Sequence, residues 1–189
     1  MSIILASQSP RRRELLAQMG VPQFEVVPAL GEEIASPGLS PAQLVEVLSR
    51  QKAEEVAVQA GPDDVVIAAV LGKPRDPADA ARMLSLLSGR AHTVYTGVTV
   101  RRGTFSLTAH EATQVRFRPL TQSEISAYIA TGEPMDKAGA YGIQGRGCVL
   151  VEGIDGNYHN VVGLPTCLLA GMLRQVGIDV LTGGQEGRP

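Results

Sequence analysis

Residues 2–16 constrain the fold most strongly, because an apolar strand, a Ser-x-Ser pair, three arginines and a helix start follow one another there. The apolar run at residues 3–6 predicts a short buried strand. Pro10 suits the first turn of a helix, and Ser7 or Ser9 can serve as its N-cap. The free N–H groups and the positive end of the helix dipole then face the connecting loop, so this segment predicts an anion site.

Three consecutive arginines occupy the first turn of this predicted helix. Arg11 and Arg12 carry planar guanidiniums that match phosphate oxygens in pairs, which a lysine does less specifically. Cations in the first turn oppose the helix dipole unless an anion offsets them. We therefore expect these arginines to bind phosphate; the alternative is an ordinary capped amphipathic helix with solvated arginines.

The charge balance favours a small phosphorylated ligand over nucleic acid. The chain has 17 Lys and Arg against 19 Asp and Glu, a net charge of -2, so it has no global positive field for a polyanion. Its 189 residues, 44% of them hydrophobic, suffice for a substantial core in one domain or in two small lobes.

The cysteines and the hydropathy pattern indicate no special chemistry. Cys148 and Cys167 lie in apolar sequence without metal-ligand spacing, so we expect two buried, reduced thiols. The sequence has neither a signal peptide nor an apolar run of membrane-spanning length. The expected compartment is therefore the cytoplasm, and no membrane partner is expected.

Periodicity and breakers predict a mixed α/β chain. Helices are expected over residues 10–19, 41–60, 77–87, 123–131 and 164–176. Further strands are expected over residues 24–27, 65–69, 91–101, 104–117 and 148–154, with a glycine-rich loop over residues 139–147. The chain shows no internal repeat, so we expect a single domain over residues 1–181 and a disordered tail over residues 182–189.

Four further motifs carry a family resemblance. They read Gly-Lys-Pro-Arg-Asp at 72–76, Ser-Gly-Arg-Ala-His-Thr-Val-Tyr-Thr-Gly-Val at 88–98, Gly-Glu-Pro-Met-Asp-Lys-Ala-Gly-Ala-Tyr-Gly-Ile-Gln-Gly at 132–145 and Val-Gly-Leu-Pro at 162–165. With these motifs and the first one, the chain resembles the Maf family of nucleoside triphosphate pyrophosphatases from Leu5 to about Leu173. The resemblance implies an elongated mixed sheet flanked by helices, similar to the ITPase fold, with two lobes around a nucleotide cleft. It also implies hydrolysis of a nucleoside triphosphate to the monophosphate and pyrophosphate with a divalent cation, and a homodimer.

The same resemblance assigns roles to individual residues. It puts Ser7, Arg11 and Arg12 on the triphosphate, and Glu33, Lys52 and Lys73 around the same cleft. Arginines, lysines and Mg²⁺ or Mn²⁺ suit this reaction, because it requires positioning and neutralisation of the phosphate oxygens. Glu33 is the expected metal ligand, and Lys52 and Lys73 are the expected catalytic cations. The alternatives are a solvated loop acid for Glu33 and an ordinary surface lysine for Lys52.

The loop at residues 137–145 resembles the branch of the family that hydrolyses dTTP and UTP, whose signature here is Ala-Tyr-Gly-Ile-Gln. The carboxamide of Gln144 can donate to the O4 carbonyl of uracil or thymine and accept from its N3–H, whereas cytosine inverts that pattern. The resemblance also makes Arg11 a specificity position. The alternative is a tight glycine-rich turn in which Tyr141 belongs to the core.

One departure from the family concerns catalysis. Family members have an apolar strand that ends in Ala-Asp-Thr, and that Asp is the proton acceptor. This chain passes from Ala69 directly to Val70-Leu71-Gly72, so roughly eight or nine residues, including the Asp, have no counterpart. Asp63 and Asp64 precede the strand and are poor substitutes, because a register change would move the apolar run. Asp76 is expected to cap the helix that starts at Pro77.

Three interpretations of this gap stay open. In the first, the chain is a dTTP and UTP pyrophosphatase whose loop is missing from this sequence. In the second, it is a variant that binds pyrimidine triphosphates, hydrolyses them poorly and acts as a nucleotide-responsive regulator of division. The third interpretation is a shortened product that folds badly, because the missing piece supplies a hairpin at the sheet edge. The expected function is the pyrophosphatase.

Overall fold

The structure, a computed structural model, describes residues 1–21, 23–70 and 76–182. Six strands lie within these ranges: β1 (Ile3–Leu5), β2 (Glu25–Val26), β3 (Val65–Val70), β4 (Ala91–Arg102), β5 (Phe105–Phe117) and β6 (Val151–Asp155). They form one sheet in the order β2-β1-β3-β4-β5-β6. β1 pairs in parallel with β2 and β3, whereas the remaining neighbours pair antiparallel, so the sheet is mixed as expected.

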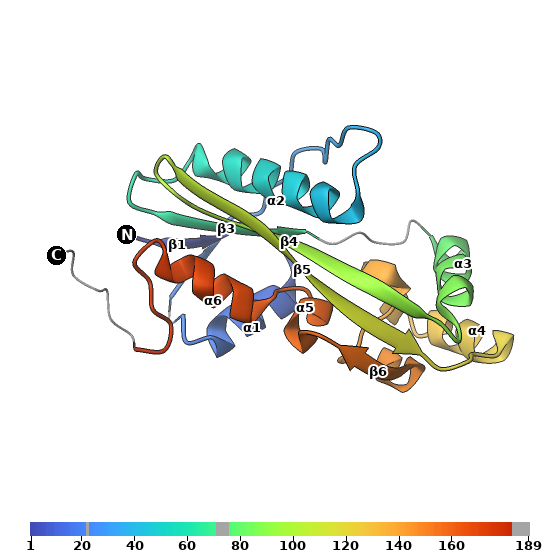
Figure 1. Cartoon of the computed structure of the whole chain (residues 1–189). Coiled ribbons are helices and arrows are strands. Elements are labelled where there is room, and N and C mark those ends of the chain that lie inside the picture. Colours follow the sequence, from blue (N-terminus) through green and yellow to red (C-terminus); the bar gives the residue numbers. More distant parts are fainter. Residues whose placement is uncertain (22, 71–75, 183–189) are drawn as a thin grey trace.

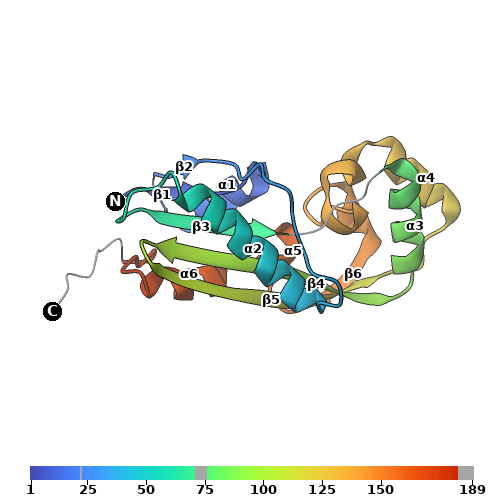
Figure 2. The ribbon, with the colours of Figure 1, turned by 90° about the horizontal axis from the view of Figure 1, so that it is seen from above.

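Helices cover both faces of this sheet. Within the described ranges they are α1 (Pro10–Gln18), α2 (Pro41–Ala57), α3 (Pro77–Leu87), α4 (Gln122–Ala130), α5 (Tyr158–Val162) and α6 (Thr166–Arg174), with short 3-10 helices η1 (Glu133–Asp136), η2 (Ala138–Ala140) and η3 (Arg146–Leu150). α2 lies on one face, and α1 and α6 lie on the other (Figure 1). α3 and α4 lie at the far end of the β4–β5 hairpin, beyond the reach of the first three strands (Figure 2).

The central strand β3 contributes to two cores at once. All six of its residues are buried. Val65, Ile67 and Ala69 pack in the core with α1 and α6, whereas Val66 and Ala68 pack on the side of α2. Side chains alternate along a strand, so a strand covered on both faces is apolar throughout, which explains the uninterrupted apolar run.

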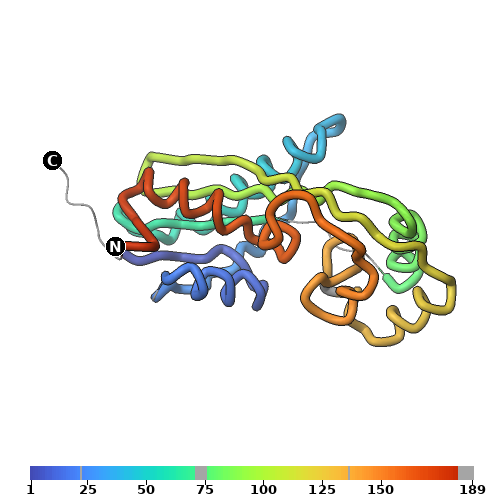
Figure 3. Tube along the Cα trace, turned by 60° about the horizontal axis from the view of Figure 1, so that its bottom comes forward, coloured from blue at the N-terminus to red at the C-terminus, as the bar shows by residue number. Residues whose placement is uncertain are grey.

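A separate core holds the second lobe together. Val115 and Phe117 from β5 pack there with Leu84 of α3, Ile125 of α4 and Tyr141. The trace gathers residues 120–155 at one end of the molecule, while β1, α1 and α6 lie at the other (Figure 3). The long β4–β5 hairpin runs through both parts, which confirms the expected elongated α/β fold.

Local caps set several helix starts where the sequence predicts them. The Ser40 hydroxyl accepts from the Gln43 N–H at 3.3 Å, and the Gln43 side chain accepts from the Ser40 N–H at 3.0 Å, which forms a capping box at α2. The Asp76 carboxylate accepts from the Asp79 N–H at 2.7 Å and caps α3, as expected. These contacts span three residues, so the local sequence suffices to predict them.

Two segments differ from the predicted elements. The strand expected at residue 148 begins only at Val151, because residues 146–150 form η3. The N–H groups of Arg146 and Gly147 bind the Glu133 carboxylate there, which keeps this segment out of the sheet. The sequence also gives no sign of α5, whose N-cap Asn157 accepts from the Asn160 N–H at 3.0 Å.

Cys148 and Cys167 are free thiols as expected, but the prediction that they are buried is wrong, because both are exposed. Cys167 lies in the first turn of α6, whose buried face is formed by Leu169, Met172 and Leu173. The apolar neighbours that favoured burial therefore face the core while the thiol faces away from it.

Two further expectations concern membrane-spanning helices and the C-terminal tail. No helix in the described ranges combines the length and the apolar character needed to span a membrane. The tail expected over residues 182–189 lies, apart from Thr182, outside the described residues.

Candidate active site

A cavity of about 460 Å³ lies where β1 and β3 end and α1 begins. β1 and β3 are parallel, so their carboxyl ends meet at the same edge of the sheet, where ligands of α/β proteins commonly bind. The cavity brings together five of the predicted site residues: Ser7, Arg11, Arg12, Glu33 and Lys52. Among the residues that the structure describes, the others that line the cavity are Ala6, Gln8, Ser9, Pro10, Ala29, Val70, Ala138, Val162 and Gly163. Lys73 lies outside the described residues.

The N-terminus of α1 opens onto this cavity. Ser9 occupies the N-cap position, but its side chain makes no capping hydrogen bond, so the expectation of a hydroxyl cap on the first turn is wrong for Ser9. Ser7 does not cap the helix either; its hydroxyl accepts from the Ser9 N–H at 3.2 Å. The first turn therefore carries no capping side chain and has no acidic residue, which suits an anionic ligand.

Arg12 is held by two separate motifs. Its Nε donates to the Gly163 carbonyl at 2.8 Å, and its Nη1 donates to the Ser7 hydroxyl at 3.0 Å. Desolvation by burial and the neighbouring charge of Arg11 lower the pKa of Arg12 to about 10, although Glu33 acts in the opposite direction. The guanidinium stays protonated at neutral pH, and an anion in the cavity would compensate for its lost solvation.

Glu33 and Lys52, which both line the cavity, form an ion pair, with 2.6 Å between Lys52 Nζ and Glu33 Oε1. Lys52 comes from α2 and Glu33 from the segment that precedes this helix. The Lys52 side chain is 24% exposed, so it is not the ordinary surface lysine of the alternative interpretation.

Two residues that the sequence reasoning missed fix the segment that carries Glu33. The Glu55 carboxylate accepts from the N–H groups of Leu30 and Gly31, and the Gln51 carboxamide accepts from the Ile34 N–H at 3.2 Å. Gln51 and Glu55 are four residues apart on α2, so they share one face of the helix. The four-residue spacing of these polar residues beside Lys52 was the sequence signal that could have indicated their role.

The donor set allows a divalent cation only together with a ligand. Glu33 is the one carboxylate among the described residues that line the cavity. No group of three or more His, Cys, Asp and Glu suited to a metal ion occurs in the described ranges. Mg²⁺ keeps several waters and needs one or two carboxylates plus substrate phosphates. The residues present therefore fit a cation that binds with a polyphosphate.

A smaller pocket of about 40 Å³ adjoins the cavity and shares Arg11, Ala138 and Val162 with it. Gln144 lines this pocket together with Arg11, so the structure brings the two predicted specificity residues together. Tyr141 also lines it and is only 6% exposed. Its hydroxyl lies 3.0 Å from His92 Nε2, and burial raises its pKa, so Tyr141 is a core residue as well as a pocket wall.

The end of β3, after which the family resemblance implies a catalytic acid, lies on the cavity. Val70 follows Ala69 in β3, is buried and lines the cavity. Asp64 lies at the other end of β3, where its carboxylate accepts from the N–H groups of Ser2 and Gly61. Asp63 pairs with Arg102 at 3.4 Å. Neither of these two acids lines the cavity, which agrees with their rejection as substitutes.

A mixed α/β fold with a cationic cavity at a strand edge and a helix N-terminus defines a protein that binds a phosphate-bearing ligand. Residues 2–176 match the family model described as Maf-like protein. The chain belongs to the Maf family.

Several relatives cover almost the whole chain. A dTTP/UTP pyrophosphatase of Symbiobacterium thermophilum is 51% identical over 190 residues, covering 96% of this chain and 97% of the relative. One of Moorella thermoacetica is 53% identical over 189 residues, covering 94% and 96%. Among solved structures, a nucleoside-triphosphatase / dITP/XTP pyrophosphatase from Mycobacterium abscessus has a TM-score of 0.43 and 16% identity, covering 70% of this chain and 95% of that one.

The first of these alignments also bears on the missing segment. It spans 190 positions, whereas the aligned 96% of this 189-residue chain amounts to about 181 residues. About nine positions therefore hold no residue of this chain. This number agrees with the segment that the family pattern has after Ala69.

Proposed function

We propose that this chain is a nucleoside triphosphate pyrophosphatase that converts dTTP and UTP into the monophosphate and pyrophosphate. The observation that carries the proposal is the convergence of Ser7, Arg11, Arg12 and Lys52 on one cavity beside the smaller pocket of Gln144. The names of the relatives at about 50% identity support the same reaction and the same nucleotides.

In this proposal the triphosphate lies against the N-terminus of α1. Arg12 is already oriented by Ser7 and Gly163, so it can pair with phosphate oxygens without first ordering its side chain. Arg11 lines both spaces and can contact the phosphates or the base. Lys52, which is paired with Glu33, adds a further cationic group to the lining of the cavity. Together these cations neutralise the charge that is redistributed when the α–β anhydride is cleaved.

A divalent cation belongs to this proposal as the family resemblance implies. When bound, Mg²⁺ or Mn²⁺ would neutralise phosphate charge as a Lewis acid. Glu33 is the residue that would hold it. Lys73 is proposed as a second catalytic cation, and a homodimer in the cytoplasm is proposed as the working form.

The rate depends on how the attacking water loses its proton. The family's Asp has no counterpart, and Glu33 is the one carboxylate among the described cavity residues. A positioned general base contributes about 10² to 10⁴ in rate. We therefore expect turnover below that of a chain in which the Ala-Asp-Thr segment is restored.

The experiment measures pyrophosphate release from dTTP, UTP, CTP and 7-methyl-GTP with Mg²⁺ or Mn²⁺. The chain is compared with a version that carries the Ala-Asp-Thr hairpin between Ala69 and Val70. The proposal expects hydrolysis of dTTP and UTP by both versions, faster in the second. Absence of hydrolysis by both versions, with UTP still raising the melting temperature, would leave a nucleotide binder and overturn the proposed reaction.

A further inference from the structure

We infer that Glu133 is a positioning residue for base recognition: its carboxylate fixes the loop that presents Gln144 and thereby sets the discrimination between uracil and cytosine. The inference rests on the proposed function, because it names a determinant of the same site. Glu133 lines neither the cavity nor the smaller pocket, so it acts through the loop and not on the ligand.

Three donors converge on the Glu133 carboxylate. Its Oε2 accepts from the Arg146 N–H at 2.8 Å. Its Oε1 accepts from the Gly147 N–H at 3.1 Å and from the Tyr128 hydroxyl at 2.8 Å. Both oxygens are therefore engaged, and two of the three bonds go to the backbone that follows Gln144.

The same network reaches the backbone that precedes Gln144. The Tyr128 hydroxyl, which donates to Glu133, accepts from the Gly142 N–H at 3.0 Å. Gly142 lies two residues before Gln144, and Arg146 lies two residues after it. Glu133 and Tyr128 thus hold the loop on both sides of the residue that reads the base. A side chain on a loop fixed at two points has fewer orientations to lose on binding.

The glycines of this loop are explained by the close approach of these side chains. A Cβ on Gly145 would lie 2.5 Å from both Glu133 carboxylate oxygens, and a Cβ on Gly147 would lie 2.7 Å from the Tyr128 hydroxyl. Neither glycine has a positive φ, so a left-handed backbone does not account for them. Gly145 and Gly147 therefore occupy positions at which the loop backbone packs directly against the Glu133 carboxylate and the Tyr128 hydroxyl, because a Cβ there would collide with these groups.

The carboxylate is charged in this position. Burial raises the pKa of Glu133, but hydrogen bonds from Arg146, Gly147 and Tyr128 and the charge of Lys137 outweigh burial, so the net pKa is lowered. Hydrogen bonds to an ionised acceptor are stronger than those between neutral groups. An uncharged side chain of the same shape should hold the loop less firmly.

The test is Glu133→Gln, which keeps the shape and removes the charge and one acceptor. We expect the ratio of kcat/KM for UTP over CTP to fall about tenfold, mainly through a higher KM for UTP. Tyr128→Phe removes the hydroxyl that accepts from the Gly142 N–H, and it should also lower the UTP to CTP ratio of kcat/KM. This second variant keeps the inference open to refutation if Glu133→Gln does not fold.

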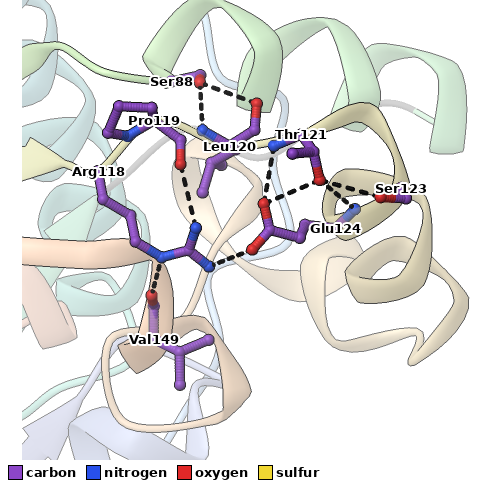
Figure 4. Close-up of polar contacts among 8 residues, drawn as sticks. All are labelled: Ser88, Arg118, Pro119, Leu120, Thr121, Ser123, Glu124 and Val149. Carbon is purple, nitrogen blue, oxygen red and sulfur yellow. Dashed lines mark hydrogen bonds and ion pairs between the residues drawn. The ribbon is translucent and has the colours of Figure 1, made fainter.

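Glu124→Gln is the matched control, because it removes another carboxylate of the same lobe. Glu124 contacts Arg118 and the Thr121 cap of α4 and does not contact the loop of Gln144 (Figure 4). We expect this variant to melt at a lower temperature with an unchanged UTP to CTP ratio. If Glu133→Gln and Tyr128→Phe behave in the same way as this control, Glu133 serves stability alone and the inference is overturned.

Binding without turnover separates this inference from the proposed reaction. Non-hydrolysable UTP and CTP analogues are titrated by calorimetry into the same variants. A chain that does not hydrolyse UTP but prefers its analogue, and loses the preference in Glu133→Gln, overturns the reaction and supports the inference. An unchanged chain without any preference for the UTP analogue overturns the inference.

Discussion

Arg12 and Gly163 are 151 positions apart in the chain, yet the Arg12 Nε donates to the Gly163 carbonyl at 2.8 Å. This bond joins the first motif, at the start of α1, to the Val-Gly-Leu-Pro motif, which runs from the last residue of α5 to the residue before α6. Both motifs line the cavity. The guanidinium therefore has a fixed orientation before any phosphate arrives.

Arg12→Lys should lower kcat/KM for dTTP and UTP by about tenfold to a hundredfold. A lysine keeps the charge but cannot donate to Ser7 and Gly163 with one planar group while also facing a phosphate. Arg13→Lys is the control, since Arg13 is exposed and its side chain donates to the Gln8 carbonyl at 3.4 Å. The check is steady-state kinetics on both variants. Equal losses of kcat/KM in the two variants would mean that the fixed orientation of the Arg12 guanidinium does not contribute to the reaction.

Glu33→Gln should raise the Mg²⁺ or Mn²⁺ concentration needed for half-maximal rate by at least about tenfold, because a carboxamide is a weaker ligand for a hard cation. The substitution also leaves Lys52 without its ion-pair partner at 2.6 Å. Glu32→Gln, one residue earlier, is the matched control. Titration of the metal at saturating UTP gives the comparison, and an unchanged metal requirement in Glu33→Gln would exclude Glu33 as the ligand.

Val70→Asp should increase the rate of hydrolysis, by up to about a hundredfold if the new carboxylate accepts the proton. Val70 follows Ala69 at the end of β3, is 3% exposed and lines the cavity, so an aspartate there stands where the family pattern has its acid. Val70→Asn is the control for polarity without charge. Single-turnover rates with dTTP decide the matter, and equal rates for both variants would show that the acid must come from a longer segment.

Much of the fold follows from contacts between residues close in sequence. The capping box of Ser40 and Gln43 and the cap of Asp76 on α3 span three residues each, and both helices start where the sequence predicts. The apolar run of β3 is equally local. Such elements are predictable because the signal and the structure it sets lie in the same few residues.

The site was less predictable from local sequence. Arg12 depends on Gly163, and the position of Glu33 depends on Glu55, which holds the segment before it at Leu30 and Gly31. Likewise, η3 replaces the start of the predicted strand because Arg146 and Gly147 bind Glu133, thirteen and fourteen residues earlier. The family resemblance supplied the residues of the cavity, whereas the partners that orient them are visible only in the folded chain.

Acidification should destabilise the second lobe through His92. Burial lowers the pKa of His92 below its ordinary value. Its Nε2 lies 3.0 Å from the Tyr141 hydroxyl, its ring packs edge-on against Phe117, and its Nδ1 is buried with no hydrogen-bond partner among the described residues. The unfolded chain therefore binds a proton more readily than the folded chain. The contribution of His92 to the free energy of unfolding should decrease as the pH falls from about 6.5 toward the lower pKa of the folded state. Above about pH 6.5 this contribution should not change with pH.

The measurement is urea unfolding between pH 5.5 and 8 for the unchanged chain, His92→Phe and His110→Gln. His92→Phe keeps a ring against Phe117 but cannot titrate, so its free energy of unfolding should depend less on pH over this range. His110 lies at the surface with its Nδ1 2.7 Å from Glu46 Oε1, and its removal leaves the contribution of His92 in place. If His92→Phe retained the full dependence on pH, the buried Nδ1 would not be the group that is protonated.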